Sequence, residues 1–112
     1  FAGGAGLVST TSDYAKFLQM MLNGGQLNGQ RLLSPTTVRL MTSNQIGQLG
    51  LGPNKFGLGF QITTEAGAAK GGPSAGSYDW GGIFGTKYWV DPKEELVVLL
   101  YTQKFPNTTA AD

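Results

Sequence analysis

The sequence predicts one α/β domain of the α+β type over residues 1–112, in which two helices precede about three antiparallel strands. An apolar stripe at helical spacing and a Ser-Pro helix entry lie in residues 9–44, the expected helical part. Alternating and continuous apolar runs lie in residues 56–103, the expected sheet part. Periods of about 3.6 and 2 residues are typical of helices and strands respectively, and they indicate this order of elements.

The first helix is expected to begin near Thr11. Hydroxyl side chains just before it are good N-caps, and Asp13 falls in the first turn, where the helix dipole favours a carboxylate. Apolar residues then recur on one helical face at Tyr14, Phe17, Leu18, Met21 and Leu22. Asn23-Gly24-Gly25 supplies a C-terminal stop.

A minor hairpin and a second helix follow. Asn28-Gly29 has the composition of a two-residue type I′ turn. Ser34 is the expected cap of the second helix, with Pro35 at its first position and its end at about Met41. Leu33 is placed to pack on Val38 as a hydrophobic staple.

The second half of the chain predicts strands separated by loops. Residues 44–55 are expected to form a loop, and residues 56–62 alternate as one half-buried strand. Residues 65–77 are rich in Ala, Gly and Ser, which predicts a flexible connection. Residues 83–90 and 96–101 are expected to pair as an antiparallel hairpin around a turn at 91–94.

The run from Leu96 to Tyr101 is apolar at every position. Such a strand usually needs cover on both faces, and the two predicted helices can cover only one. We therefore expect either an incomplete domain or a homo-oligomer that buries the second face.

Composition excludes several classes of function. The net charge is +1 and no basic run occurs, so a nucleic-acid partner is not expected. Histidine and cysteine are both absent, which removes Ser-His and Cys-His catalysis and most metal sites, and no cofactor or metal is expected. No apolar stretch approaches the ~20 residues that span a bilayer, so a soluble chain without a membrane partner is expected.

Several candidate catalytic residues have ordinary explanations. Residues 72–76 match the G-x-S-x-G pattern around Ser74, but the strand before and the helix after it that a nucleophile elbow requires are not predicted. Lys70 is interpreted as a solvated lysine, and Asp79, Asp91, Glu94 and Glu95 form no pair at catalytic or metal-ligand spacing. Three of these acids, Asp91, Glu94 and Glu95, lie in or beside the predicted turn and are interpreted as solvated residues.

The most distinctive segment is Tyr78-Asp79-Trp80-Gly81-Gly82-Ile83-Phe84-Gly85-Thr86, which has three glycines in five residues. Glycine weakens a strand interior and commonly marks a bulge, tight packing, or the close approach of a ligand. The spacing alone favours neither a binding edge nor a packing explanation.

Four segments together resemble a known family: residues 4–17, Leu32-Leu33-Ser34-Pro35, Phe56-Gly57-Leu58-Gly59-Phe60, and Trp80-Gly81-Gly82 with Phe84-Gly85-Thr86 and Val90-Asp91-Pro92. They resemble the C-terminal part of the serine β-lactamase and penicillin-binding-protein-like superfamily, and most closely the class C-like, family VIII carboxylesterases. The resemblance implies the C-terminal portion of a β-lactamase-like fold. The compartment is left open between the cytoplasm and the periplasm of a bacterial-type cell.

The resemblance further implies a site on this chain. Trp80-Gly81-Gly82 matches the third family motif, which forms a wall of the substrate site, and the backbone N–H of Ile83 would be one of two oxyanion-hole donors. The Ser-x-x-Lys and Tyr-x-Asn motifs of the family do not occur here. The chain is therefore expected to be the C-terminal segment of a Ser-Lys-Tyr hydrolase of esters, or of β-lactams, and inactive without an N-terminal part of the same enzyme. The alternative is a non-catalytic module that associates with itself or a partner through its sheet edge.

Overall fold

The computed structural model describes residues 3–4, 6–50 and 52–104. Ala5 of the family-like segment and Leu51 of the predicted loop lie outside these residues. The elements are, in order, α1 (Thr11–Leu22), β1 (Gln26–Leu27), β2 (Gln30–Arg31), α2 (Pro35–Met41), β3 (Lys55–Phe56), β4 (Gln61–Ile62), α3 (Glu65–Ala69), β5 (Tyr78–Gly81), β6 (Lys87–Asp91) and β7 (Leu96–Leu100). The predicted α/β class with antiparallel strands is confirmed.

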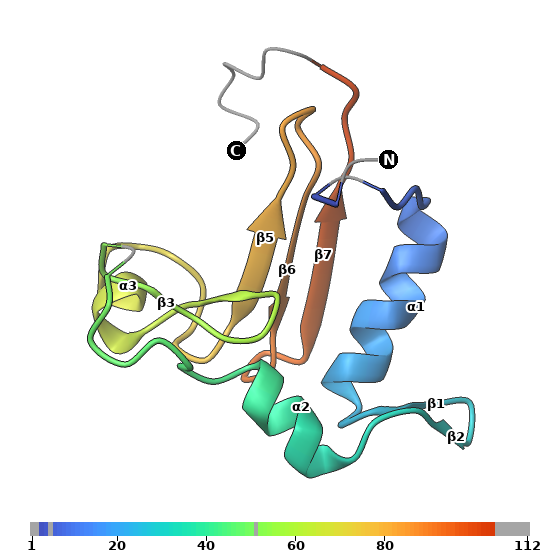
Figure 1. Cartoon of the computed structure of the whole chain (residues 1–112), viewed down its shortest axis with the longest axis horizontal. Coiled ribbons are helices and arrows are strands. Elements are labelled where there is room, and N and C mark those ends of the chain that lie inside the picture. Colours follow the sequence, from blue (N-terminus) through green and yellow to red (C-terminus); the bar gives the residue numbers. More distant parts are fainter. Residues whose placement is uncertain (1–2, 5, 51, 105–112) are drawn as a thin grey trace.

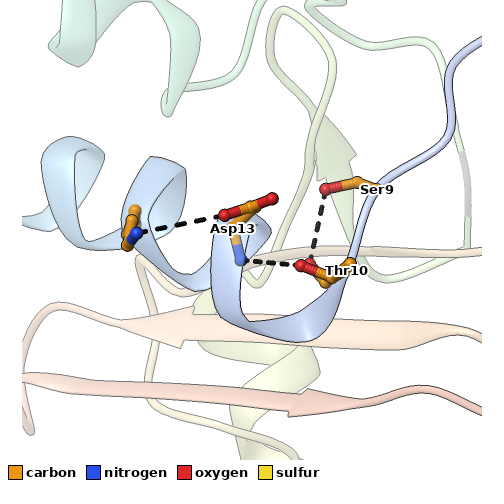
Figure 2. Close-up of polar contacts among 4 residues, drawn as sticks. Ser9, Thr10 and Asp13 are labelled. Atoms are coloured by element: carbon orange, nitrogen blue, oxygen red, sulfur yellow. Dashed lines mark hydrogen bonds and ion pairs between the residues drawn. The ribbon is translucent and has the colours of Figure 1, made fainter.

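The start of α1 is confirmed at Thr11. Figure 2 shows the cap: the Thr10 hydroxyl accepts a hydrogen bond from the Asp13 backbone N–H at 3.1 Å. The Ser9 hydroxyl donates to the Thr10 carbonyl, and the Asp13 carboxylate lies 3.9 Å from the Lys16 ammonium. The exposed cap therefore fixes where the helix begins, while Leu18, Met20 and Met21 are buried along its inner face.

The hairpin β1–β2 and helix α2 also form as predicted. Asn28 and Gly29 have φ angles of 52° and 78°, the left-handed pair that a type I′ turn requires. The Ser34 hydroxyl accepts from the Thr37 N–H at 3.1 Å, and Pro35 is the first residue of α2.

The single strand predicted over residues 56–62 is wrong. The chain instead turns back on itself between β3 and β4, with the Gly57 N–H donating to the Phe60 carbonyl at 2.8 Å. Gly59 has a φ of +92°, and Gly57 lies so close to the Met41 carbonyl that no side chain fits there. Leu58 is consequently exposed rather than buried.

The flexible connection predicted over residues 65–77 is also wrong in part, because residues 65–69 form the short helix α3. Thr64 caps it by accepting from the Gly67 N–H at 3.1 Å, and Glu65 lies in its first turn. Its five residues are mostly Ala and Gly, too few to show a helical apolar stripe.

The main sheet has five antiparallel strands in the order β3-β4-β5-β6-β7, two more than expected. Figure 1 shows α1 running alongside the β5–β6–β7 strands, with α2 near its C-terminal end and α3 beside β3. Helix α1 packs on β7. The core between the helices and the sheet is formed by Leu18, Met20, Met21, Val38, Phe60, Ile62, Tyr78, Tyr88 and Val90.

Strand β7 lies at the edge of this sheet among the described residues. Val97 and Leu99 pack against the core, and the alternation of the strand turns their neighbours to the opposite face. Leu96 and Leu100 remain 46% and 42% exposed there. In the described part of the chain, no helix is both long enough and apolar enough to cross a membrane.

Candidate functional site

Part of strand β5 has no neighbour on one side. Strand β4 pairs only with Tyr78 and Asp79, the first half of β5. On the other side, β6 pairs with all four residues of β5. Within the described residues, the edge of the sheet is therefore open from Trp80 onward, next to the end of β4.

The direction of the backbone groups follows from the ladder. The Gly82 N–H donates to the Thr86 carbonyl at 2.8 Å, toward β6, while Ser77 accepts from the Thr63 N–H at 2.8 Å, on the β4 side. Backbone groups alternate between the two sides of an antiparallel strand. This alternation turns the backbone groups of Gly81 toward the open edge.

Ile83 lies in the turn after β5 and not in a strand, which corrects the strand predicted over residues 83–90. Strand β6 begins only at Lys87. The turn is closed by the Gly85 N–H, which donates to the Gly82 carbonyl at 3.1 Å, and Gly85 has a φ of +89°. No described residue accepts a hydrogen bond from the Ile83 N–H. Its role as an oxyanion donor stays a prediction.

Packing explains at least part of the requirement for glycine in this turn. A Cβ on Gly82 would collide with the Thr86 hydroxyl, and a Cβ on Gly81 would lie 3.3 Å from the Thr86 carbonyl oxygen. The Thr86 side chain can rotate, so the obstacle at Gly82 is a movable hydroxyl rather than backbone. Binding of a ligand over these glycines stays a prediction.

Trp80 lies at the surface of two cavities. Its side chain is 49% exposed, and its ring packs edge-on against Phe56 with 5.3 Å between ring centroids. One cavity, of about 550 Å³, is bounded by the segment before α1, α1 itself, β5 with the turn after it, β6 and the segment after β7. The other, of about 360 Å³, adjoins Gln61, Asp79 and Lys87. Both cavities reach Gly81 and Gly82, so the predicted substrate-binding residues lie together where ligand could approach.

We call the larger one the tyrosine cavity, because Tyr14, Tyr88 and Tyr101 line it together with Trp80, Ile83 and Phe84. The Tyr14 ring lies 5.1 Å from the Tyr88 ring. Burial is the main cause that raises the pKa of Tyr88, and the neighbouring Tyr14 hydroxyl adds to it. Burial also raises the pKa of Tyr101, with a smaller electrostatic contribution from Tyr14. These two phenols therefore stay protonated and uncharged at neutral pH.

The smaller one, the Asp79 cavity, is polar. The Gln61 side-chain amide donates to the Asp79 carboxylate at 3.2 Å across strands β4 and β5. Burial raises the pKa of Asp79, and the Gln61 hydrogen bond and the Lys87 charge oppose that rise. Neither cavity could be predicted from the sequence, since both depend on which strands lie side by side.

Ser74 and Asp91 form a structural contact in the loop before β5. The Asp91 carboxylate accepts from the backbone N–H groups of Ser74 and Glu94, both at 3.2 Å. Asp91 is buried, so its interpretation as a solvated turn residue is wrong. Ser74 lies between a helix and a strand, the reverse of the order in a nucleophile elbow. Lys70 is exposed.

Metal ligation has no evident location in the described part of the chain, where no three His, Cys, Asp or Glu side chains cluster together.

The beta-lactamase family model matches residues 1–112, and the chain therefore belongs to the beta-lactamase family.

Two curated relatives extend this similarity. Protein Rv1367c of Mycobacterium tuberculosis is 32% identical over 120 residues, covering 93% of this chain and 29% of that protein. The "Putative D-alanyl-D-alanine carboxypeptidase" of Escherichia coli K12 is 31% identical over 117 residues, covering 99% of this chain and 25% of that protein. The chain thus spans between a quarter and a third of the length of these relatives.

The crystal structure of a penicillin-binding protein homolog from Caulobacter crescentus has the same fold over this region. The TM-score is 0.64 at 22% sequence identity, and the match covers 86% of this chain and 26% of that one. The fold therefore corresponds to part of a β-lactamase-like fold.

Proposed function

We propose that this chain is the C-terminal segment of a serine hydrolase that cleaves acyl esters through an acyl-enzyme intermediate. The observation that carries the proposal is the open edge of β5 at Trp80-Gly81-Gly82, which lies beside the tyrosine cavity and is followed by an Ile83 N–H without a described acceptor. Membership of the beta-lactamase family supports it. The self-association module considered above is not favoured, because the family match extends over the whole chain.

The chemistry divides between this chain and a segment that carries Ser-x-x-Lys. The serine oxygen attacks the ester carbonyl carbon, and the carbonyl oxygen becomes an oxyanion that accepts a hydrogen bond from the Ile83 N–H. The lysine and tyrosine of the upstream motifs take the serine proton during this attack and pass it to the alcohol oxygen as the carbon–oxygen bond breaks. Water then attacks the acyl-serine, one of its protons returns to the serine oxygen through the same groups, and the carboxylic acid is released with the serine regenerated. A fixed donor about 3 Å from the developing charge changes the rate by on the order of 10²–10³.

Esters are favoured over β-lactams and over C-terminal peptides, the substrate class in the name of the Escherichia coli relative. The resemblance implies that the third family motif begins with lysine in β-lactamases and with histidine in some relatives, whereas here it begins with Trp80. A cation at that position, which would hold a substrate carboxylate, is therefore missing. A neutral ester needs no such cation.

The test uses the longer polypeptide in which this chain follows a Ser-x-x-Lys segment. We expect turnover of p-nitrophenyl butyrate and at least tenfold lower kcat/KM for nitrocefin and for a D-alanyl-D-alanine peptide. Trp80→Lys should shift kcat/KM toward nitrocefin relative to the ester, while the control Leu49→Lys, at an exposed loop position outside both cavities, should leave the ratio unchanged. A preference for nitrocefin or the peptide in the unmodified protein would contradict the ester assignment.

A further inference from the structure

Among the described residues, none that lines the tyrosine cavity carries a charged side chain. Its polar groups are neutral: the three tyrosine hydroxyls, Ser9, Thr86 and the Gln103 amide. The Asp79 cavity on the other side of Trp80, in contrast, contains both a carboxylate and an ammonium group. A group that enters the tyrosine cavity meets apolar surface and neutral hydrogen-bonding partners, and no described lining residue offers a charge to pair with its own.

Burying an unpaired charge in such a place is costly, whereas an uncharged apolar group gains from leaving water. Because both cavities meet at Gly81 and Gly82, a carbonyl group held at the open edge would direct one of its substituents into the tyrosine cavity. The volume of about 550 Å³ lies within the range of small-molecule sites.

We propose that the tyrosine cavity is a subsite for an uncharged, largely apolar substituent of the ester, and that Tyr101 is the residue that sets how large this substituent can be. The proposal rests on the proposed function for the identity of the ester. The substrate of that same site is then an ester with one uncharged, largely apolar substituent of limited size.

Tyr101 differs from the other two tyrosines in how it is held. Tyr14 packs against Phe17 and Tyr88, and Tyr88 also packs against Phe60, so both rings belong to the aromatic packing of the core. Tyr101 follows the end of β7 and is only half buried. Its side chain can therefore be shortened at little cost to the core, which makes it the adjustable part of the cavity lining.

The test measures binding to the 112-residue chain, so it does not depend on turnover. Two probes of equal length are titrated by calorimetry: butyranilide, which is neutral, and succinanilate, which carries a carboxylate at the end of the same acyl chain. We expect butyranilide to bind at least tenfold more tightly. Equal affinities, or no measurable binding of butyranilide up to its solubility limit, overturn the proposal.

Matched variants locate the binding. Gln103→Arg places a cation at the exposed rim of the cavity and should reduce the preference for the neutral probe at least fivefold. Gln48→Arg, at an exposed position in the loop before β3, should leave it unchanged. If both substitutions change the preference equally, the probes bind elsewhere and the proposal is wrong.

The size prediction has its own variant. Tyr101→Ala should raise the affinity for octananilide relative to butyranilide at least fivefold, while Tyr101→Phe should keep the unmodified ratio; circular dichroism checks that both variants fold. An unchanged ratio in folded Tyr101→Ala overturns the role of Tyr101. Neutral-probe preference without ester turnover in the longer polypeptide would instead support the cavity and contradict the proposed function.

Discussion

Position 82 can require glycine for two physical reasons, and they can be separated. A Cβ there meets the Thr86 hydroxyl within the turn, and the same residue precedes the Ile83 N–H at the open edge of β5. The first reason concerns stability. The second concerns the position of a donor that the proposed oxyanion hole requires.

We expect Gly82→Ala in the longer polypeptide to lower the free energy of unfolding by about 1–3 kcal/mol through overpacking. Adding Thr86→Ala removes the obstructing hydroxyl and should restore most of that stability. Ester turnover should stay reduced, by on the order of 10²-fold relative to Thr86→Ala alone, because the added methyl group displaces the donor. Urea unfolding and kcat are measured for each variant. Recovery of turnover together with stability would leave packing as the whole explanation for this glycine.

The buried carboxylate of Asp91 should make the stability of the loop before β5 depend on pH. Burial alone would raise the pKa of its carboxyl, but hydrogen bonds from Ser74 and from the Glu94 and Lys93 backbone outweigh it, and the pKa is lowered. A lowered pKa in the folded state contributes stability that is fully present above the unfolded value of about 3.9 and is lost as the pH falls through the folded value. Asp91 should therefore stabilise the loop before β5 at neutral pH and progressively less below about pH 4.

The measurement is the free energy of unfolding in urea at pH 7 and pH 3. Asp91→Asn should cost about 1–3 kcal/mol at pH 7, typical of hydrogen bonds to a charged group, and clearly less at pH 3. Glu94→Gln, an exposed change in the same turn that keeps the backbone donor, should cost less than about 0.5 kcal/mol at either pH. An Asp91→Asn cost that is the same at both pH values would show that the charge of the carboxylate is not what stabilises the loop.

At the scale of elements, β7 exposes apolar side chains at the edge of the described sheet. Leu96 and Leu100 lie on the face away from α1 and are nearly half exposed. An unpaired strand edge with an apolar face is prone to pair with another chain. We expect the 112-residue chain to associate, and Leu96→Lys with Leu100→Lys to shift it toward the monomer in sedimentation velocity. Leu49→Lys, which changes an even more exposed leucine in a loop, should not; a monomeric unmodified chain would contradict the prediction.

Helices α1 and α2 could be predicted because their signals are local. Thr10 and Ser34 cap them through side chains that bond to a backbone N–H three residues on. Thr64 and Glu65 form the same kind of local capping signal for α3. The Ala and Gly residues that follow them show no apolar stripe, so the sequence does not indicate a helix there. The turn at Gly57–Phe60 was missed for a different reason: the contact of Gly57 with Met41 joins two elements, and alternation of apolar residues does not report such contacts.

At the scale of the whole molecule, the sequence motif located the candidate site but not its surroundings. Trp80-Gly81-Gly82 could be recognised from the chain alone. The short pairing of β4, which leaves the edge open, and the meeting of Tyr14, Tyr88 and Tyr101 depend on contacts between residues far apart in sequence. Local patterns carry no information about which residues of distant elements meet in a cavity.

The groups that the proposed mechanism needs lie partly on this chain and partly on the rest of the protein. The chain supplies one wall and one candidate donor, whereas an acyl-enzyme mechanism also needs an activated serine that acts on the same carbonyl. The 112-residue chain alone should therefore hydrolyse neither p-nitrophenyl butyrate nor nitrocefin above the buffer rate. Turnover of the ester should appear when a separately expressed Ser-x-x-Lys segment is added, and it should be lost when the serine of that segment is replaced by alanine. Robust ester turnover by the isolated chain would overturn the assignment of the nucleophile, since the serine responsible would then have to be one of those in this sequence. In that case Ser9, which lines the tyrosine cavity, would be the first to replace.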